Sequence, residues 1–195
     1  MKKYVFLFEE GSASMQNVLG GKGANLAEMT NLKIPVPPGF TISTDACVYY
    51  MKHNKYPSGF KKQMISALKA VELKMNRKFG DSNNPLLLSV RSGARQSMPG
   101  MMETVLNIGL SPLTIEGMIK STNNPKFVYD SYRRLIMMYA DVVMEKESGN
   151  NEENKDGIRL DLETIMYEMK KSKNIKNDFE LDVDDLKILI EKFKS

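Results

Sequence analysis

The chain has 195 residues, of which 42% are hydrophobic and 27% charged, and its formal net charge is +4. This composition is that of an ordinary soluble protein, and the length suffices for one domain or two small ones. The single cysteine, Cys47, excludes an internal disulfide framework and fits a reducing compartment. One histidine and one cysteine cannot make a zinc site. Because neither a signal peptide nor an apolar stretch of membrane-spanning length is visible, we expect a soluble, cytoplasmic protein with no membrane partner.

Charge is distributed unevenly along the chain. Residues 1–111 contain 14 Lys and Arg against 7 Asp and Glu, whereas residues 112–195 contain 14 against 17. A basic first half would suit a nucleotide or a nucleic acid. The aromatic content of 8%, the absence of Trp and the lack of a recognised nucleic-acid module argue against nucleic acid as the partner.

The first predicted elements are a strand at residues 4–8, a loop at 10–14, and a glycine-rich loop that feeds a helix running to about Leu32. Free amides and the positive end of a helix dipole would meet at this loop, and Lys22 adds a cation, so the pattern indicates an anion site. It is not a Walker A loop, because Gly23 follows Lys22 and Gln16 occupies the first glycine position. The alternative is a turn with a solvated lysine.

Residues 34–42 form a proline-stiffened connector that leads into a short strand. Ser43 or Thr44 then caps a helix with Asp45 in its first turn. His53 lies near the end of that helix, and no chemistry is assigned to it. A packing helix follows at residues 60–77, with an apolar stripe made of Phe60, Met64, Ile65, Ala67, Leu68, Val71 and Met75.

Two short apolar runs, at residues 86–90 and 105–110, are predicted to be strands. The first opens directly into a Gly/Ser/Arg segment that contains Arg91 and Arg95. Two guanidinium groups and several backbone amides at one sheet edge can hold an anion, and phosphate is the natural one. The alternative is that both arginines pair with Glu103 or another surface carboxylate.

The remainder of the chain is predicted to be helical. Helices are expected to about residue 121, at 125–145, at 160–172 and at 182–193, and a polar loop is expected at 148–157. Asn124 and Asp182 are the predicted N-caps of the second and fourth of these helices. We therefore predict an α+β protein with an α/β subdomain at 1–111 and an all-helical subdomain at 112–195. No converging acid–base or metal cluster is identified in the helical part.

Four segments, in this order, resemble the N-terminal nucleotide-binding part of the pyruvate, phosphate dikinase family. They read GGKGANLAEM, IPVPPGFTIST, LLLSVRSGARQSMPGMMETVLNIGL and NPKFVYDSYRRLIMMYADVVM. The similarity extends from Tyr4 to about Glu145 and returns near LDVDDLKILIEKFK. The related phosphoenolpyruvate synthases share the GGK and VRS pattern but continue differently after VRS, so RSGARQSMPGMMET favours the phosphate-using enzyme.

This resemblance implies an ATP-grasp-like fold, present in part, in which ATP lies between subdomains. Lys22 resembles the family's lysine on the nucleotide phosphates, and Arg91 resembles its arginine on the transferred phosphoryl groups. Arg95, Met102 and Thr104 belong to the same loop and would line the adenosine or triphosphate pocket, unless their role is structural. Mg²⁺ is expected with ATP, and its carboxylate ligands are expected mostly outside this chain.

The family reaction converts ATP, pyruvate and phosphate to AMP, phosphoenolpyruvate and pyrophosphate through a phosphorylated histidine on another domain. His53 does not lie in the phosphohistidine motif, and the chain is several times shorter than family members, so it is expected to be a truncated portion without catalytic residues. Its partners would be ATP and the remaining domains of a homodimeric enzyme, and alone it should be inactive. The alternatives are a stand-alone nucleotide-binding or interaction module, and a related dikinase acting on water or a glucan.

Overall fold

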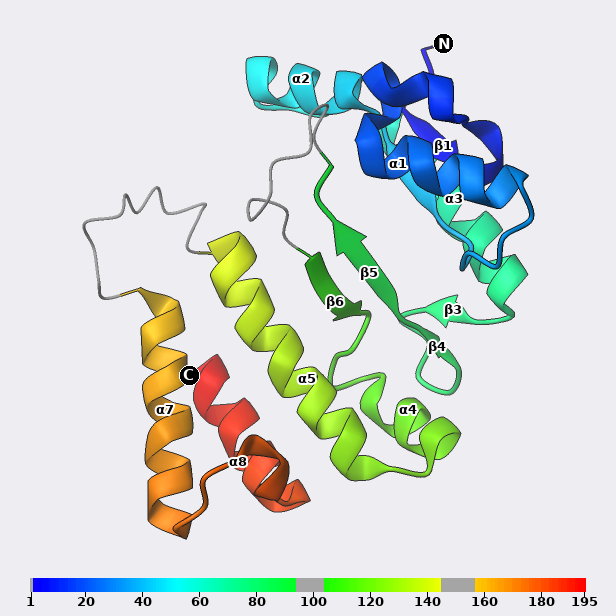
Figure 1. Cartoon of the computed structure of the whole chain (residues 1–195). Helices are drawn as coiled ribbons and strands as arrows, with labels where there is room; N and C mark the ends of the chain where they lie inside the picture. The colour runs from blue at the N-terminus through cyan, green and yellow to red at the C-terminus, as the bar shows by residue number, and fades with distance from the viewer. Residues whose placement is uncertain (1, 94–103, 145–156) are drawn as a thin grey trace. The chain divides into compact units, whose positions relative to one another are not determined.

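The computed structural model describes residues 2–93, 104–144 and 157–195, and the chain divides into two compact units (Figure 1). The N-terminal unit contains residues 1–77 and 91–103, and the C-terminal unit contains residues 78–90 and 104–195. Helices and small two-stranded sheets occur together, so the predicted α+β class is confirmed at this level. The division into subdomains at residue 111 stays a prediction. The compact units follow packing instead, and packing joins the strands that precede residue 111 to the helices that follow it.

The N-terminal unit is built around a two-stranded antiparallel sheet. Strand β1 (Val5–Leu7) pairs with β2 (Phe40–Ile42), and Phe6 lies opposite Thr41. Successive side chains of a strand point to opposite faces, so β1 serves two cores. Val5 and Leu7 pack into one hydrophobic cluster, while Phe6 packs against the other.

Three helices cover this sheet. Helix α1 (Gln16–Asn31) supplies Leu19, Ala24 and Ala27 to one cluster, whereas α2 (Thr44–His53) and α3 (Phe60–Met75) supply Ala46, Phe60 and Ala67 to the other. Two short 3-10 turns, at Phe8–Glu10 and Ala13–Met15, connect β1 to α1. Ser43 is the N-cap of α2 and its hydroxyl accepts from the amide of Ala46, which confirms one of the two predicted caps. The predicted stripe on α3 is too wide, because Ile65 and Met75 are about 40% exposed.

The strands of the C-terminal unit are short. β3 (Lys78–Phe79) runs parallel to β4 (Pro85–Leu86), and β5 (Leu88–Arg91) pairs with β6 (Thr104–Ile108). These strands confirm the two apolar runs predicted on either side of the Arg-containing segment, except that the first run is divided at Leu87. Arg91 is the last residue of β5. It is also the first residue of the second segment of the N-terminal unit, residues 91–103.

Helices make up the rest of this unit. They are α4 (Ile115–Thr122), α5 (Pro125–Tyr139) with a π-helical turn at Ala140–Met144, α7 (Ile158–Lys173), a 3-10 turn at Asp178–Glu180, and α8 (Val183–Lys194). Asn124 and Asp182 cap α5 and α8 as predicted. One cluster joins α4, α5, α8 and β6, and a second joins α7 and α8. The predicted polar loop at 148–157 lies almost wholly outside the described residues.

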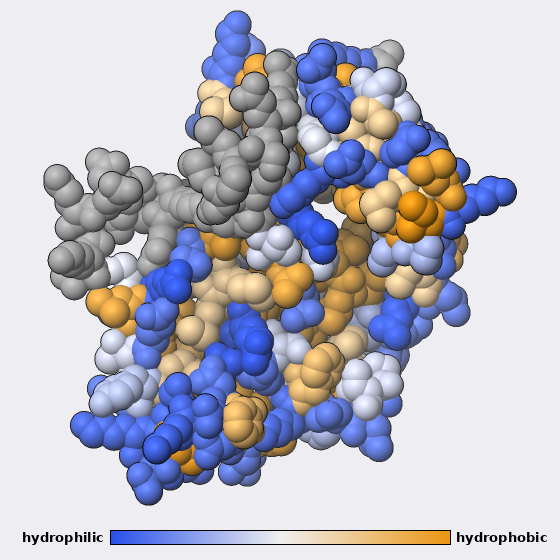
Figure 2. Space-filling model, viewed as in Figure 1, coloured by the Kyte–Doolittle hydropathy of each residue, from blue (hydrophilic) through white to orange (hydrophobic). Residues whose placement is uncertain are grey.

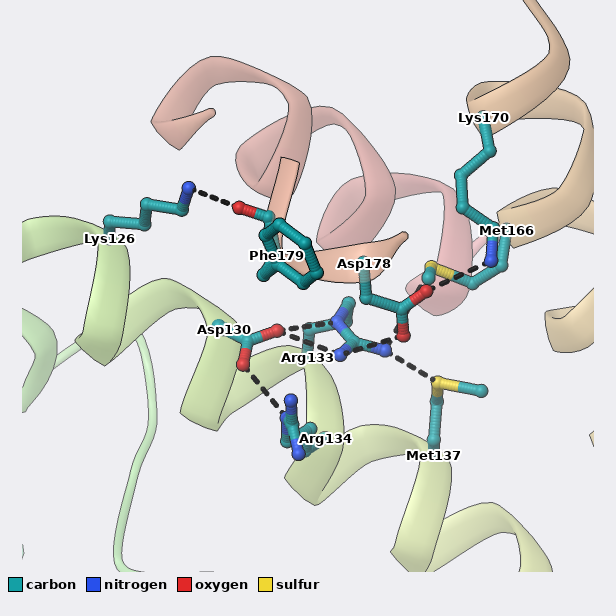
Figure 3. A network of polar contacts seen from close by, with 9 residues as sticks. All are labelled: Lys126, Asp130, Arg133, Arg134, Met137, Met166, Lys170, Asp178 and Phe179. Atoms are coloured by element: carbon teal, nitrogen blue, oxygen red, sulfur yellow. Dashed lines mark hydrogen bonds and ion pairs between the residues drawn. The ribbon is translucent and has the colours of Figure 1, made fainter. Parts of the chain in front are cut away.

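A buried arginine on α5 holds the helices of this unit together (Figure 3). Arg133 is 3% exposed, and its Nε and Nη2 donate to Oδ1 of Asp130 at 3.0 and 2.7 Å. Nη2 also lies 3.5 Å from Oδ2 of Asp178 in the 3-10 turn before α8. Nη1 donates to the sulfur atoms of Met137 and Met166 at 3.2 and 3.9 Å. A buried guanidinium requires partners of this kind, because unpaired charge is costly inside a protein.

Asp178 is shared between two cations. Its second oxygen, Oδ1, accepts from Lys170 on α7 at 2.9 Å. Burial raises the pKa of Asp178, but the hydrogen bond from Lys170 and the charge of Arg133 outweigh burial and lower that pKa below its ordinary value of 3.8. The ionised form therefore ties α7 and α5 to the turn that begins α8. Lys126 adds a bond from α5 to the backbone oxygen of Phe179 at 2.6 Å.

The surface visible in Figure 2 is mainly hydrophilic, with hydrophobic residues exposed at several places. Among the described residues the most exposed large hydrophobic side chains are Leu73, Met51 and Phe179. In the described part of the chain, each helix is too short or too polar to cross a membrane.

The variant Asp178→Asn tests this network. We expect the C-terminal unit to lose about 1 kcal/mol of unfolding free energy near neutral pH, a figure kept small because the side chain is 39% exposed. A carboxylate with a lowered folded-state pKa stabilises the fold above its unfolded pKa, and this stabilisation is lost as pH falls through the folded pKa. The difference from the wild-type chain should therefore vanish as pH falls below 3.8. Hydrogen exchange at the amides of α5 and α8 measures it for this unit alone.

Glu168→Gln is the matched control for Asp178→Asn. Glu168 is an exposed carboxylate on α7 and belongs to none of the ion pairs found among the described residues. Its substitution should leave the free energy within about 0.5 kcal/mol of the wild-type value. If the control loses as much unfolding free energy as Asp178→Asn, the network does not specifically stabilise this unit. The same conclusion follows if the loss in Asp178→Asn persists at low pH.

Candidate functional site

The glycine-rich stretch lies inside α1 and breaks it. Gly20 has φ 69° and ψ 167°, which is far from helical backbone, although residues on both sides of it are helical. This combination of dihedral angles is almost restricted to glycine, because a Cβ atom would collide with the backbone. The prediction of a loop that feeds a helix is therefore partly corrected. The helix already begins at Gln16, and a single residue, rather than a loop, interrupts it.

The break lies where the helical hydrogen bonds of three backbone amides would cross it. A helical hydrogen bond from the amide of residue i to the carbonyl of residue i−4 encloses residues i−3 to i−1. The bonds that would enclose Gly20 are those donated by Gly21, Lys22 and Gly23. Three successive amides therefore stand at the start of a new helical run, where the helix dipole is positive. Such an arrangement can hold an anion.

The two glycines after the break have different surroundings. A Cβ atom placed on Gly21 would meet nothing within 4 Å, so this position opens to a space that a ligand could enter. A Cβ atom on Gly23 would lie 2.7 Å from Cγ2 and 2.9 Å from Oγ1 of Thr41 on β2. Gly23 thus allows the second run of α1 to rest directly on the sheet. After the break, the backbone of α1 therefore packs against the sheet at Gly23 and is open at Gly21.

Lys22 is the second residue after the break and is half-buried. None of the described carboxylates forms an ion pair with it. Lys22 lies in helical backbone rather than on a turn, and its role in anion binding stays a prediction.

The second predicted anion site is described only in part. Arg91 is exposed at the end of β5, and it has no ion pair with any described carboxylate. Thr104 begins β6 and is half-buried. Arg95 and Met102 lie outside the described residues, as does Glu103, so their predicted roles stay predictions. No polar contact among the described residues joins Lys22 to Arg91.

Two threonines near the break were not predicted as parts of the site. Thr41 packs against Gly23, and the hydroxyl of Thr44 donates to the carbonyl oxygen of Asn17 at 2.7 Å. The sequence indicated Thr44 only as a possible helix cap. Contacts between segments 27 residues apart leave no signal in local patterns, so only the folded chain reveals them.

A divalent cation site is not found in the described ranges. Within them, no group of three or more His, Cys, Asp or Glu side chains converges closely enough to hold a metal ion. Mg²⁺ requires several oxygen ligands, so the described carboxylates do not fit such a site and no chemical step is assigned to the ion in this chain.

Comparison with known proteins identifies relatives of the whole chain. Residues 16–58, which include the break, Thr41 and Thr44, match the family described as pyruvate phosphate dikinase, AMP/ATP-binding domain. The chain is 50% identical over 196 residues to a pyruvate, phosphate dikinase of Clostridium symbiosum, an alignment that covers 100% of this chain and 21% of that relative. It is 43% identical over 198 residues to a chloroplastic pyruvate, phosphate dikinase of Mesembryanthemum crystallinum, covering 99% of this chain and 20% of the relative.

A third relative, from Rhizobium meliloti, is also a pyruvate, phosphate dikinase, and is 52% identical over 149 residues, with 74% of this chain and 17% of the relative covered. The chain thus spans about a fifth of the length of the curated relatives it matches. These similarities confirm the family resemblance that the sequence motifs predicted.

The Gly20 break can be tested by substitution. Gly20→Ala places a Cβ atom in backbone that is almost exclusive to glycine, so the N-terminal unit should lose about 1–3 kcal/mol of unfolding free energy. Gly21→Ala makes the same chemical change one residue later, in open space, and should leave stability unchanged or raise it by up to about 1 kcal/mol. Hydrogen exchange at the α1 amides measures both. Equal losses in the two variants would contradict a specific requirement at Gly20.

Proposed function

We propose that this chain, related along its length to the N-terminal regions of pyruvate, phosphate dikinases, is the ATP-binding portion of such an enzyme. The observation that carries the proposal is the break in α1, which places the amides of Gly21 to Gly23 at the start of a helical run beside Lys22, in the segment that matches an AMP/ATP-binding domain. A triphosphate is the anion that suits this arrangement, because several phosphate oxygens can engage amides and a lysine together. The rest of the fold would be ATP-grasp-like, with ATP between subdomains.

In this proposal each group has a defined role. The amides of Gly21, Lys22 and Gly23 donate to phosphate oxygens, and the Lys22 ammonium neutralises part of their charge. Arg91 neutralises the phosphoryl groups that are transferred, since phosphoryl transfer depends mainly on positioning and charge stabilisation. Arg95, Met102 and Thr104 would complete the pocket. Mg²⁺ would accompany ATP, and its ligands would lie mostly outside this chain.

The full-length enzyme would convert ATP, pyruvate and phosphate to AMP, phosphoenolpyruvate and pyrophosphate. Phosphate, rather than water or a glucan, is favoured as the co-substrate because the relatives reported above are all pyruvate, phosphate dikinases. The phosphorylated histidine would lie on another domain, so this chain contributes nucleotide binding and not the complete reaction. A homodimer in the cytoplasm is proposed from the resemblance and from the reducing environment that Cys47 suits.

Substitution of Lys22 tests nucleotide binding directly. Lys22→Met keeps an unbranched side chain of similar length but removes the charge. The affinity for ATP should therefore fall about tenfold or more, while the affinity for adenosine stays the same. Isothermal titration calorimetry of the chain with ATP and with adenosine gives both constants. Lys69→Met, a change at an exposed lysine on α3, is the control and should alter neither.

Arg91→Ala should likewise weaken binding of ATP more than binding of adenosine, because the guanidinium group contacts phosphoryl groups in this proposal. The same calorimetric comparison applies. If ATP and adenosine lose affinity equally, Arg91 has a structural role. If the Lys22 and Arg91 variants both bind ATP like the wild-type chain, the proposed function is wrong.

A further inference from the structure

Gly23, the third residue after the break in α1, lies between two neighbours that leave no room for a side chain. A Cβ atom placed on it would lie 2.7 Å from Cγ2 and 2.9 Å from Oγ1 of Thr41 on β2. The same atom would lie 3.2 Å from Cβ of Leu19, before the break. Carbon atoms in contact normally stand about 3.5–4.0 Å apart. The backbone at Gly23 therefore lies closer to the sheet than a residue with a side chain would allow.

Space, and not backbone strain, is what excludes a side chain at Gly23. This residue is not among the glycines with a positive φ, so its backbone conformation is open to alanine. Alanine is also a better helix former than glycine. Local propensity therefore favours alanine at this position, and the contacts with Thr41 and Leu19 oppose it.

Thr41 has little freedom to move aside. Its side chain is branched at Cβ, which restricts it to few rotamers, and both of its γ atoms face Gly23. Its backbone belongs to β2, where Thr41 lies opposite Phe6 of β1. Leu19 is 4% exposed and packed in the core. A methyl group at Gly23 would therefore displace the second run of α1 from the sheet, by about 1 Å.

Lys22 would move with that displacement. It directly precedes Gly23, is half-buried and lies in the same helical run. Ala24 and Ala27 of this run are 0% and 1% exposed and belong to the cluster that packs against Phe6. The run is thus seated on the core through residues with little or no side chain, and Gly23 is the one that adjoins Lys22.

We infer that the contact between Gly23 and Thr41 is a positioning element for phosphate binding: it fixes how closely the second run of α1 approaches β2, and thereby where Lys22 meets ATP. The inference rests on the proposed function for its ligand, whereas the contact itself is independent of that ligand. Thr41 acts through α1 in this inference and is not itself placed on ATP.

Gly23→Ala tests the inference, alone and combined with Thr41→Ala. The single variant should lower the affinity for ATP about three- to tenfold, the effect of weakening one or two hydrogen bonds, and leave the affinity for adenosine unchanged. Adding Thr41→Ala removes both crowding γ atoms and makes room for the new methyl group. The double variant should therefore bind ATP within about twofold of the wild-type chain, because neighbouring substitutions are coupled. Calorimetric titration with ATP and with adenosine measures these affinities.

Gly39→Ala is the matched control for crowding. A Cβ atom on Gly39 would lie 2.5 Å from Cζ and 2.6 Å from Cε2 of Phe8, so this variant crowds Phe8 in the same unit rather than α1. It should bind ATP like the wild-type chain. If it weakens ATP binding as much as Gly23→Ala does, the loss reflects general damage to the unit and the inference is wrong.

The variants also distinguish the inference from the proposed function. ATP binding by Gly23→Ala equal to that of the wild-type chain would overturn the inference, as would a failure of Thr41→Ala to restore it. The inference is also wrong if Gly23→Ala weakens ATP binding and Lys22→Met does not, because the displacement then does not act through Lys22. In the first two cases the proposed function stands as long as Lys22→Met weakens ATP binding. If Gly23→Ala, Lys22→Met and Arg91→Ala all bind ATP normally, both are wrong.

Discussion

The backbone conformation of Gly20 is the constraint on which the candidate site depends. Helical propensity alone would carry α1 through the segment from Gln16 to Asn31, and one residue with φ 69° prevents this. Glycine is the residue that adopts this backbone conformation most readily, because it has no Cβ atom. Before the break, the hydroxyl of Thr44 donates to the carbonyl oxygen of Asn17, and after it a Cβ atom placed on Gly21 would meet nothing within 4 Å. A site for an anion thus arises from backbone geometry, with Lys22 adding charge to it.

Lys22 and Arg91 differ from Arg133 in their surroundings. In the C-terminal unit, Arg133 is surrounded by Asp130, Asp178 and two sulfur atoms, and the charges stabilise contacts between helices. In the N-terminal unit, Lys22 and Arg91 have no ion pair with a described carboxylate. The uneven charge of the two halves of the sequence is consistent with this contrast, since a cation without an internal partner is free to bind a ligand.

Much of the local structure could be predicted from the sequence. Asn124 and Asp182 cap helices, as their side-chain oxygens and the apolar pattern that follows them predicted. The strands on either side of Arg91 also form as expected. Burial was predicted less well. Ile65 on α3 was assigned to an apolar stripe and is 41% exposed, whereas Arg133 on α5 is buried. Periodicity shows which side chains share a helix face, but the width of the buried part depends on the neighbouring elements.

The sequence by itself determined the helix caps, the strands, the family resemblance and the choice of Lys22 and Arg91 as anion-binding candidates. These follow from local propensities and from motifs that are contiguous in the chain. Only the tertiary structure decided that α1 breaks at Gly20, that Gly23 rests on Thr41 and that Thr44 contacts Asn17. The physical reason is that a glycine has many accessible conformations, and packing against a distant segment selects one of them.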